Sequence, residues 1–355
     1  MSLENHRGLQ GVRPPTSAGV GNGAIDIVWH SSRLGERRWT EYLFSEVRNV
    51  RQVSIAQWPR SQAMPSIHVI STNDKETKAR IPDLFIGLRN QNSPFGIFHM
   101  SDEWFREDTS FYKYCRFCLR NYWCSFIRNE DLIYIPLGYP NHCAFGSAAT
   151  APASERKHRC SFTGQMKYSR VQMVKAFETV DGFYYPRQFI SDDEYATLMR
   201  QTVFSLCPMG NATPDTWRLY ESLEAGAIPI VEKRPTMDYF RGLFGENPLP
   251  TFRSWRSARA WVDGIKSPEA LDEKQAQLQQ WWRQQKAKLR GRLAAIVRGK
   301  LDPQYQSALE NYKPAYSGTL LKIRWRLELL RHLNMGSIPR RLLKNTGLLR
   351  LDITK

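Results

Sequence analysis

Two charged residues on one short predicted helix are the clearest candidates for chemistry. Arg218 and Glu221 lie three residues apart, so a helix places both side chains on one face near its start. A guanidinium beside the N–H groups of a helix N-terminus suits a diphosphate, and a carboxylate can accept hydrogen bonds from a ribose diol. The pair therefore predicts a nucleotide site, although an ordinary surface Arg–Glu ion pair has the same spacing.

The segment around this pair, Phe204–Val231, predicts a strand, a loop, a helix, a turn and a second strand. Gly210 permits a tight turn in the loop, and Asp215 or Thr216 is suited to cap the helix. Gly226 is placed to end the helix before the chain returns to the sheet. The order of elements puts the loop and the helix start at the carboxyl edge of a sheet, where ligands bind.

This segment resembles the C-terminal motif of the exostosin-type glycosyltransferases. The motif is an apolar strand ending in Pro-x-Gly, a short loop, Arg, Glu three residues later, and then Ala-Gly-x-Ile-Pro-Val. The chain departs from it only mildly, with Ile230 in place of the last Val. The resemblance implies two domains of the B-type (GT-B) fold, a nucleotide-sugar donor of the UDP class, and inversion at the anomeric carbon. It also implies that Arg218 contacts the donor diphosphate and Glu221 the ribose.

A second segment, Cys160–Arg170, is similar to the Phe-x-Gly loop and following Arg that begin the donor domain of that family. Gly164 would let the backbone approach a phosphate, and Arg170 would neutralise it. The same residues also fit a plain strand-to-helix turn with a solvated arginine. The predicted donor-binding residues are Arg218, Glu221, Gly164, Arg170, Gly210 and Thr216.

Inverting transfer needs a group that accepts the proton of the acceptor hydroxyl. It should come from the N-terminal domain, across the cleft from the diphosphate. Asp102 is the first candidate, followed by Glu103 and His99, because all three lie at or just after the end of the predicted strand Phe95–His99. The alternative is that Ser-Asp-Glu caps a helix beginning at Glu103.

The sequence predicts no metal or other cofactor. It has no Asp-x-Asp motif, so arginine and backbone amides are expected to neutralise the leaving group in a metal-independent reaction. Cys115 and Cys118 form one C-x-x-C pair without a second pair at zinc-site spacing. We interpret them as packing cysteines in the helix-like run Tyr112–Arg120.

Buried strands that alternate with helical stretches predict an α/β protein with parallel sheets. Two Rossmann-like domains are expected to face one another across a cleft. The expected parts are a disordered N-terminus (1–23), an N-terminal acceptor domain (24–145), a linker (146–159), a C-terminal donor-binding domain (160–270) and a basic helical region (271–355) that packs back on the N-terminal domain.

The chain is strongly basic, and the surplus is concentrated near its end. The 51 Lys and Arg residues exceed the 34 Asp and Glu residues by 17. From Leu271 to Lys355 there are 18 basic against 6 acidic residues, which accounts for +12 of that surplus. Such a charge suits an anionic partner, and the amphipathic run Leu320–Leu333 fits either an anionic membrane surface or packing on the N-terminal domain.

These observations predict an inverting hexosyl- or pentosyltransferase that uses a nucleotide-sugar and a saccharide or glycolipid acceptor, as in polysaccharide biosynthesis. The alternative is a basic, non-catalytic protein on an α/β core that binds nucleic acid or a membrane surface. The motif at Phe204–Val231 has no role in that alternative, so no nucleic acid is expected. The chain has no apolar leader and no run of about 18 apolar residues. A cytoplasmic protein, peripheral to the inner membrane through its basic tail, is therefore expected.

Overall fold

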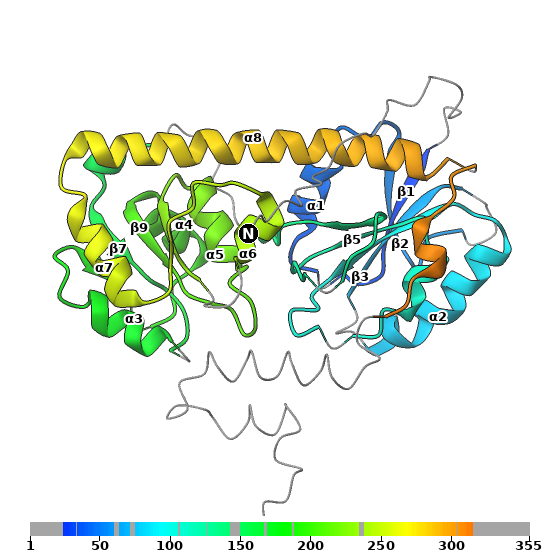
Figure 1. Ribbon diagram of the computed structural model, residues 1–355, viewed down its shortest axis with the longest axis horizontal. Helices are drawn as coiled ribbons and strands as arrows, with labels where there is room; N and C mark the ends of the chain where they lie inside the picture. Colours follow the sequence, from blue (N-terminus) through cyan, green and yellow to red (C-terminus); the bar gives the residue numbers. More distant parts are fainter. Residues whose placement is uncertain are drawn as a thin grey trace, which may run out of the picture.

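The computed structural model shows a mixed α/β protein built on two parallel sheets (Figure 1). It describes residues 24–314, except 33, 60–63, 72–74, 106, 126, 143–149, 167–168, 187, 234–237 and 303. This architecture is consistent with a Rossmann-like protein of two domains. The predicted amphipathic run Leu320–Leu333 lies outside the described residues.

The N-terminal sheet has six parallel strands in the order β2-β1-β3-β4-β5-β6. The strands are β1 (Ile25–Trp29), β2 (Val50–Ser54), β3 (Ser66–Ser71), β4 (Phe95–Met100), β5 (Phe117–Arg120) and β6 (Leu132–Tyr134). The helices of this domain are α1 (Arg37–Leu43), α2 (Lys75–Asn90) and the 3-10 turn η1 (Ser110–Tyr114). Strands β1, β3 and β4 are buried throughout, as their continuous apolar runs predicted.

The second sheet has five parallel strands in the order β11-β10-β9-β7-β8. The strands are β7 (His158–Ser161), β8 (Phe183–Tyr184), β9 (Thr202–Cys207), β10 (Ile228–Glu232) and β11 (Thr251–Phe252). The 3-10 turn η2 (Ala153–Glu155) precedes them, and the helices are α3 (Arg170–Phe177), α4 (Asp192–Arg200), α5 (Trp217–Glu224), α6 (Tyr239–Phe244) and α7 (Trp255–Gly264). The order places β9 and α5, which carry the predicted motif, in the middle of the domain.

One long helix, α8 (Pro268–Lys300), runs along both domains (Figure 1). It contacts α1 in the N-terminal domain and α5 in the second domain. Trp282 is the centre of this contact, because its ring lies 5.9 Å from that of Trp39 and 5.4 Å from that of Tyr220. Aromatic packing on both sides of one side chain ties the two domains to the same helix.

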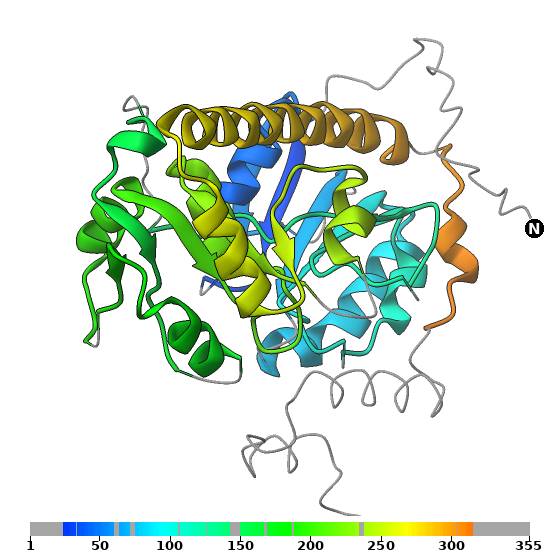
Figure 2. The same ribbon diagram turned by 60° about the vertical axis from the view of Figure 1, so that its left-hand side comes forward.

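After α8 the chain returns to the N-terminal domain, where η3 (Ala308–Asn311) contacts η1 (Figure 2). Asp131 holds the chain after α8 against the N-terminal domain. Its carboxylate is fully buried and accepts hydrogen bonds from Lys300, from the Ser307 hydroxyl at 3.2 Å and from the Ala308 N–H at 2.6 Å.

One local prediction, and one alternative that the sequence left open, were wrong. The run Tyr112–Arg120 is not a helix, since η1 ends at Tyr114 and β5 begins at Phe117, where it pairs with β4 and β6. No helix begins at Glu103, because residues 103 and 104 form a turn after β4. In both places contacts with the rest of the sheet outweigh the local helical pattern.

The cysteines follow the packing interpretation where the structure describes them. The five described cysteines are free and buried, which leaves Cys143 outside this statement. Burial raises the pKa of the Cys118 thiol to about 12, so this thiol stays protonated. Among the described helices, none is both long and apolar enough to cross a membrane.

Candidate functional site

Helix α5 begins without a side-chain cap. Thr216 occupies the N-cap position, but its hydroxyl makes no cap hydrogen bond and is buried without a partner among the described residues. Asp215 does not cap the helix either, since its carboxylate accepts hydrogen bonds from the hydroxyls of Tyr220 and Tyr239. Of the first N–H groups of α5, that of Leu219 donates to the Thr216 carbonyl at 3.1 Å, and no side chain among the described residues caps the helix start.

Asp215 is an unusual carboxyl group. It is 2% exposed, and burial raises its pKa to about 7 despite the two tyrosine hydrogen bonds and one from the backbone of Leu137. Leu137 follows β6 in the N-terminal domain, so this carboxyl group joins the two domains at the start of α5.

Arg218 and Arg170 lie together around Gly164, as the two separate sequence segments predicted for one site. A Cβ at Gly164 would stand 3.1 Å from Nη2 of Arg218 and 3.7 Å from Nη1 of Arg170. The φ of Gly164 is +134°, which favours glycine. Both guanidinium groups also lie over the ring of Phe162, at 4.8 Å and 5.8 Å from its centroid. Two cations thus meet at one glycine turn.

Backbone carbonyls orient these guanidinium groups. Arg218 donates to the carbonyl of Thr163, and Arg170 donates to those of Gln165 at 3.0 Å and Met209 at 3.2 Å. These bonds to neutral carbonyl oxygens hold the two guanidinium groups beside Gly164. Two guanidinium groups at one glycine turn are suited to an anion such as a diphosphate.

Glu221 lies on the same helix but has its own surroundings. It is 5% exposed, accepts a hydrogen bond from the Tyr195 hydroxyl at 2.5 Å, and has its other oxygen 3.6 Å from Nε2 of His142. The Glu221 carboxylate raises the pKa of His142, mainly through a side-chain hydrogen bond. His142 follows β6 in the chain, so Glu221 contacts the last described residue before 143–149.

Gly210 lies at a contact between the two domains. A Cβ there would stand 2.5 Å from Oε1 of Glu103, which leaves no room for a side chain. The Glu103 carboxylate accepts hydrogen bonds from the N–H groups of Ala212 at 2.7 Å and Thr213 at 3.2 Å, and from Nδ2 of Asn211 at 3.1 Å. The N-terminal domain thereby holds the loop that precedes α5.

The other two predicted proton acceptors gather around Arg120, which is fully buried. Asp102 accepts a hydrogen bond from Nη2 of Arg120 at 2.6 Å. His99 lies 3.2 Å from Nη1 of Arg120 and 2.5 Å from the Tyr112 hydroxyl. Burial, and then the Arg120 charge, lower the pKa of His99 well below its usual value, so this imidazole is neutral.

Backbone strain marks the same edge of the N-terminal sheet. Ser101 and Phe105, after β4, and Tyr122, after β5, have φ values of +72°, +51° and +62°. Non-glycine residues adopt this region only when their surroundings force it, and they cluster at functional sites. The residue types at these positions do not predict such strain from the sequence.

Glu36 is a residue of this edge that the sequence analysis did not single out. It follows β1, precedes α1 and is 5% exposed. Burial raises the pKa of its carboxyl group, and the nearby indole of Trp217, the first residue of α5, partly offsets this rise. Its position beyond the end of a buried strand is the signal that would have found it.

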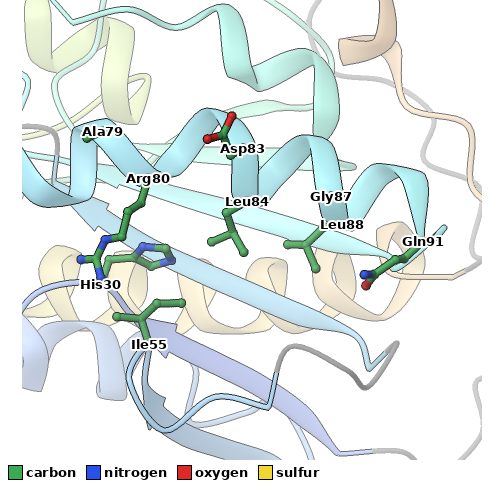
Figure 3. Close-up of a pocket in the computed structure, with 9 residues that line it drawn as sticks. All are labelled: His30, Ile55, Ala79, Arg80, Asp83, Leu84, Gly87, Leu88 and Gln91. Carbon is green, nitrogen blue, oxygen red and sulfur yellow. The ribbon is translucent and has the colours of Figure 1, made fainter.

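A cavity of about 420 Å³ lies between α2 and the edge of the N-terminal sheet (Figure 3). His30 and Arg80 lie side by side at one end of it, and Gln91 lies at the other. His30 directly follows β1, so this end of the cavity is at the carboxyl edge of the sheet. Its mixture of apolar and polar side chains is typical of small-ligand sites.

Residues 139–301 match the family model of the RXYLT1 C-terminal domain. The match includes the second sheet, α5 and α8, and leaves the N-terminal sheet outside it. It supports a glycosyltransferase in the broad sense, related to the exostosin group. The comparison with curated proteins finds no match. Among the described residues, no group of three or more His, Cys, Asp or Glu side chains is placed to hold a metal ion.

Proposed function

We propose that this chain is an inverting glycosyltransferase that takes a sugar from a UDP-sugar and passes it to a saccharide or glycoconjugate acceptor. The observation that carries the proposal is the meeting of Arg218, Arg170 and Gly164 beside the uncapped start of α5. This arrangement lies within the segment that matches a glycosyltransferase family model.

In this proposal the donor diphosphate lies between the two guanidinium groups and the first N–H groups of α5. Gly164 lets the backbone approach the phosphates, and the buried hydroxyl of Thr216 offers a further hydrogen bond. Glu221 accepts hydrogen bonds from the ribose with the oxygen that Tyr195 does not occupy, which also lies 3.6 Å from Nε2 of His142. Gly210 shapes the loop, and no metal takes part because the arginines neutralise the leaving group.

The transfer is a single displacement. The acceptor hydroxyl attacks the anomeric carbon, the bond to the diphosphate breaks with inversion, and the diphosphate leaves with the bonding electrons. A side chain of the N-terminal domain accepts the hydroxyl proton. Asp102, Glu103 and His99 are the acceptors that the sequence predicts, and all three lie at the edge that faces α5.

The acceptor is proposed to bind to the N-terminal domain. The cavity beside α2 has the volume of a small-ligand site and polar groups at both ends, namely His30, Arg80 and Gln91. Saccharides suit such a lining, because their hydroxyls need hydrogen-bond partners and their ring faces pack on apolar side chains.

Binding of a nucleotide-sugar is the decisive test. Melting temperatures are measured with a panel of UDP-, GDP-, CDP- and ADP-sugars, and calorimetry then measures the affinity for each nucleotide that shifts the transition. We expect the UDP-sugars to stabilise the protein by mass action. If no sugar nucleotide binds at millimolar concentration, the proposed function is wrong. The alternative of a basic, non-catalytic protein that binds nucleic acid or a membrane surface is then favoured.

A further inference from the structure

One carboxyl group of the N-terminal domain touches the helix that carries Arg218. The Glu36 carboxyl group lies near the indole N–H of Trp217, which partly offsets the rise in its pKa that burial causes, and the neighbouring Gly35 lies against the same ring, with its Cβ position 3.4 Å from Cη2. Trp217 begins α5 and directly precedes Arg218. Glu36 is thereby brought to the end of α5 where the donor diphosphate is proposed to bind.

The surroundings of Glu36 are suited to a proton acceptor. Its hydrogen-bond donors are neutral, namely the Trp217 indole and nearby backbone N–H groups, and among the described residues it forms no ion pair. Burial raises its pKa from the usual value of a glutamate. A carboxylate of raised pKa holds a proton better near neutral pH than an ordinary one.

Other acidic groups surround the same place. Burial raises the pKa of the Tyr122 hydroxyl well above its usual value, and the charges of Glu103, Asp215, Glu36 and Asp102 raise it further. Glu36 belongs to the β1–α1 connection, Asp102 and Glu103 follow β4, and Asp215 precedes α5. Acidic groups of both domains therefore gather around Tyr122.

The partners of the other candidates suit a different role. Asp102 is bonded to the buried cation Arg120, and His99 borders the same cation. Both oxygens of Glu103 accept hydrogen bonds from the loop before α5. Asp102 is thus committed to the Arg120 guanidinium, and Glu103 is committed to the loop before α5, so both groups position the site.

We propose that Glu36 is the general base of the transfer proposed above, and the inference rests on that function. The acceptor oxygen forms a bond to the anomeric carbon while the bond from that carbon to the diphosphate breaks. The hydroxyl proton passes to Glu36, and the electron pair leaves with the diphosphate beside Arg218. Charge and atoms balance without any further reactant.

Glu36→Gln tests the proposal, because glutamine keeps the shape and an oxygen for the Trp217 indole but accepts no proton. The assay measures nucleoside diphosphate released from the nucleotide-sugar that gives the largest melting shift, with water as acceptor. We expect kcat to fall by about 10²–10⁴-fold while calorimetry shows unchanged affinity for UDP. Formate is expected to restore turnover in Glu36→Ala, since a small carboxylate can occupy the vacated space and accept the proton.

Two variants separate catalysis from positioning. Trp217→Phe removes the indole hydrogen bond and leaves Glu36 intact, so its kcat should fall by no more than about tenfold. Glu41→Gln, on the exposed face of α1, should behave like the wild type. The pH profile adds a readout that a merely structural role would not change: the acidic limb of kcat/KM should disappear in Glu36→Gln.

The outcomes distinguish the two proposals. If the wild type turns over and Glu36→Gln keeps its kcat, or loses no more than Trp217→Phe does, Glu36 is not the base. Failure of formate to raise turnover of a Glu36→Ala variant that still binds UDP would also overturn the inference. If the wild type binds no sugar nucleotide, the proposed function itself is wrong.

Discussion

The two regions that meet at the start of α5 carry opposite charge. The second domain contributes two cations, Arg170 and Arg218, held by backbone carbonyls around one glycine. The N-terminal domain contributes Glu36 and Glu103, each of which bonds to the segment just before or at the start of α5. The basic region is suited to a diphosphate, and the acidic region is suited to moving a proton.

The two regions also differ in how the sequence encodes them. The basic region draws on two short segments, Cys160–Arg170 with Gly164 and Arg170, and Phe204–Val231 with Arg218. Within each segment the residues keep fixed distances along the chain. The acidic region draws Glu36 and Glu103 from the ends of β1 and β4, which the sheet order brings to one edge. The residues of the proposed donor site are thus readable from two local segments, whereas acid–base chemistry depends on which strand ends become neighbours.

The largest expected effect is that of Arg218→Ala, which removes a cation from the basic region. Transfer should be abolished, and UDP should bind more weakly by about 1.5–3 kcal/mol, because a charge-assisted contact is lost. Calorimetry with free UDP measures this change. Arg241→Ala, which removes only an exposed ion pair with Glu246, is the matched control. Parental affinity in Arg218→Ala would place the donor site elsewhere.

Asp102→Asn should lower the free energy of unfolding by about 3–5 kcal/mol, because it breaks an ion pair with the buried Arg120. Urea titration measures the effect. Glu107→Gln removes a surface pair with Lys78 and should cost no more than about 1 kcal/mol. A stable Asp102→Asn variant with a large loss of kcat would instead support Asp102 as the proton acceptor.

Glu103→Gln should weaken the contact between the two regions. An amide has one acceptor oxygen in place of two, so the N–H groups of Ala212 and Thr213 and the Asn211 amide lose part of their shared partner. We expect a loss of about 1.5–3 kcal/mol in stability, together with weaker UDP binding. Asn211→Ala removes one of the three bonds and should have a smaller effect. Unchanged melting temperature and UDP affinity would show that Glu103 does not hold this loop.

The smallest effect is expected from EDTA. If the arginines of the basic region neutralise the leaving group, turnover should be the same with and without chelator. The assay is release of nucleoside diphosphate after prolonged dialysis against EDTA. Complete loss of turnover that manganese restores would replace the arginine-based account with a metal-based one.

The sequence by itself determined the local elements that carry strong patterns. The apolar runs of β1, β3, β4 and β9 predicted buried strands, and Phe204–Val231 predicted the unit that holds Arg218 and Glu221. These features follow from short-range rules: strand burial, glycine turns and helix spacing. The same rules failed at Tyr112–Arg120, where pairing of β5 with β4 and β6 decided the structure.

Only the tertiary structure decided what the predicted residues touch. It placed Asp102 beside Arg120 and Glu36 beside Trp217. It also brought the Glu103 carboxylate within hydrogen-bond distance of the loop before α5. Each contact joins residues that are distant in sequence or belong to different domains. Burial and electrostatic partners, which set the proton affinity of a carboxyl group, depend on that three-dimensional neighbourhood rather than on the residue type.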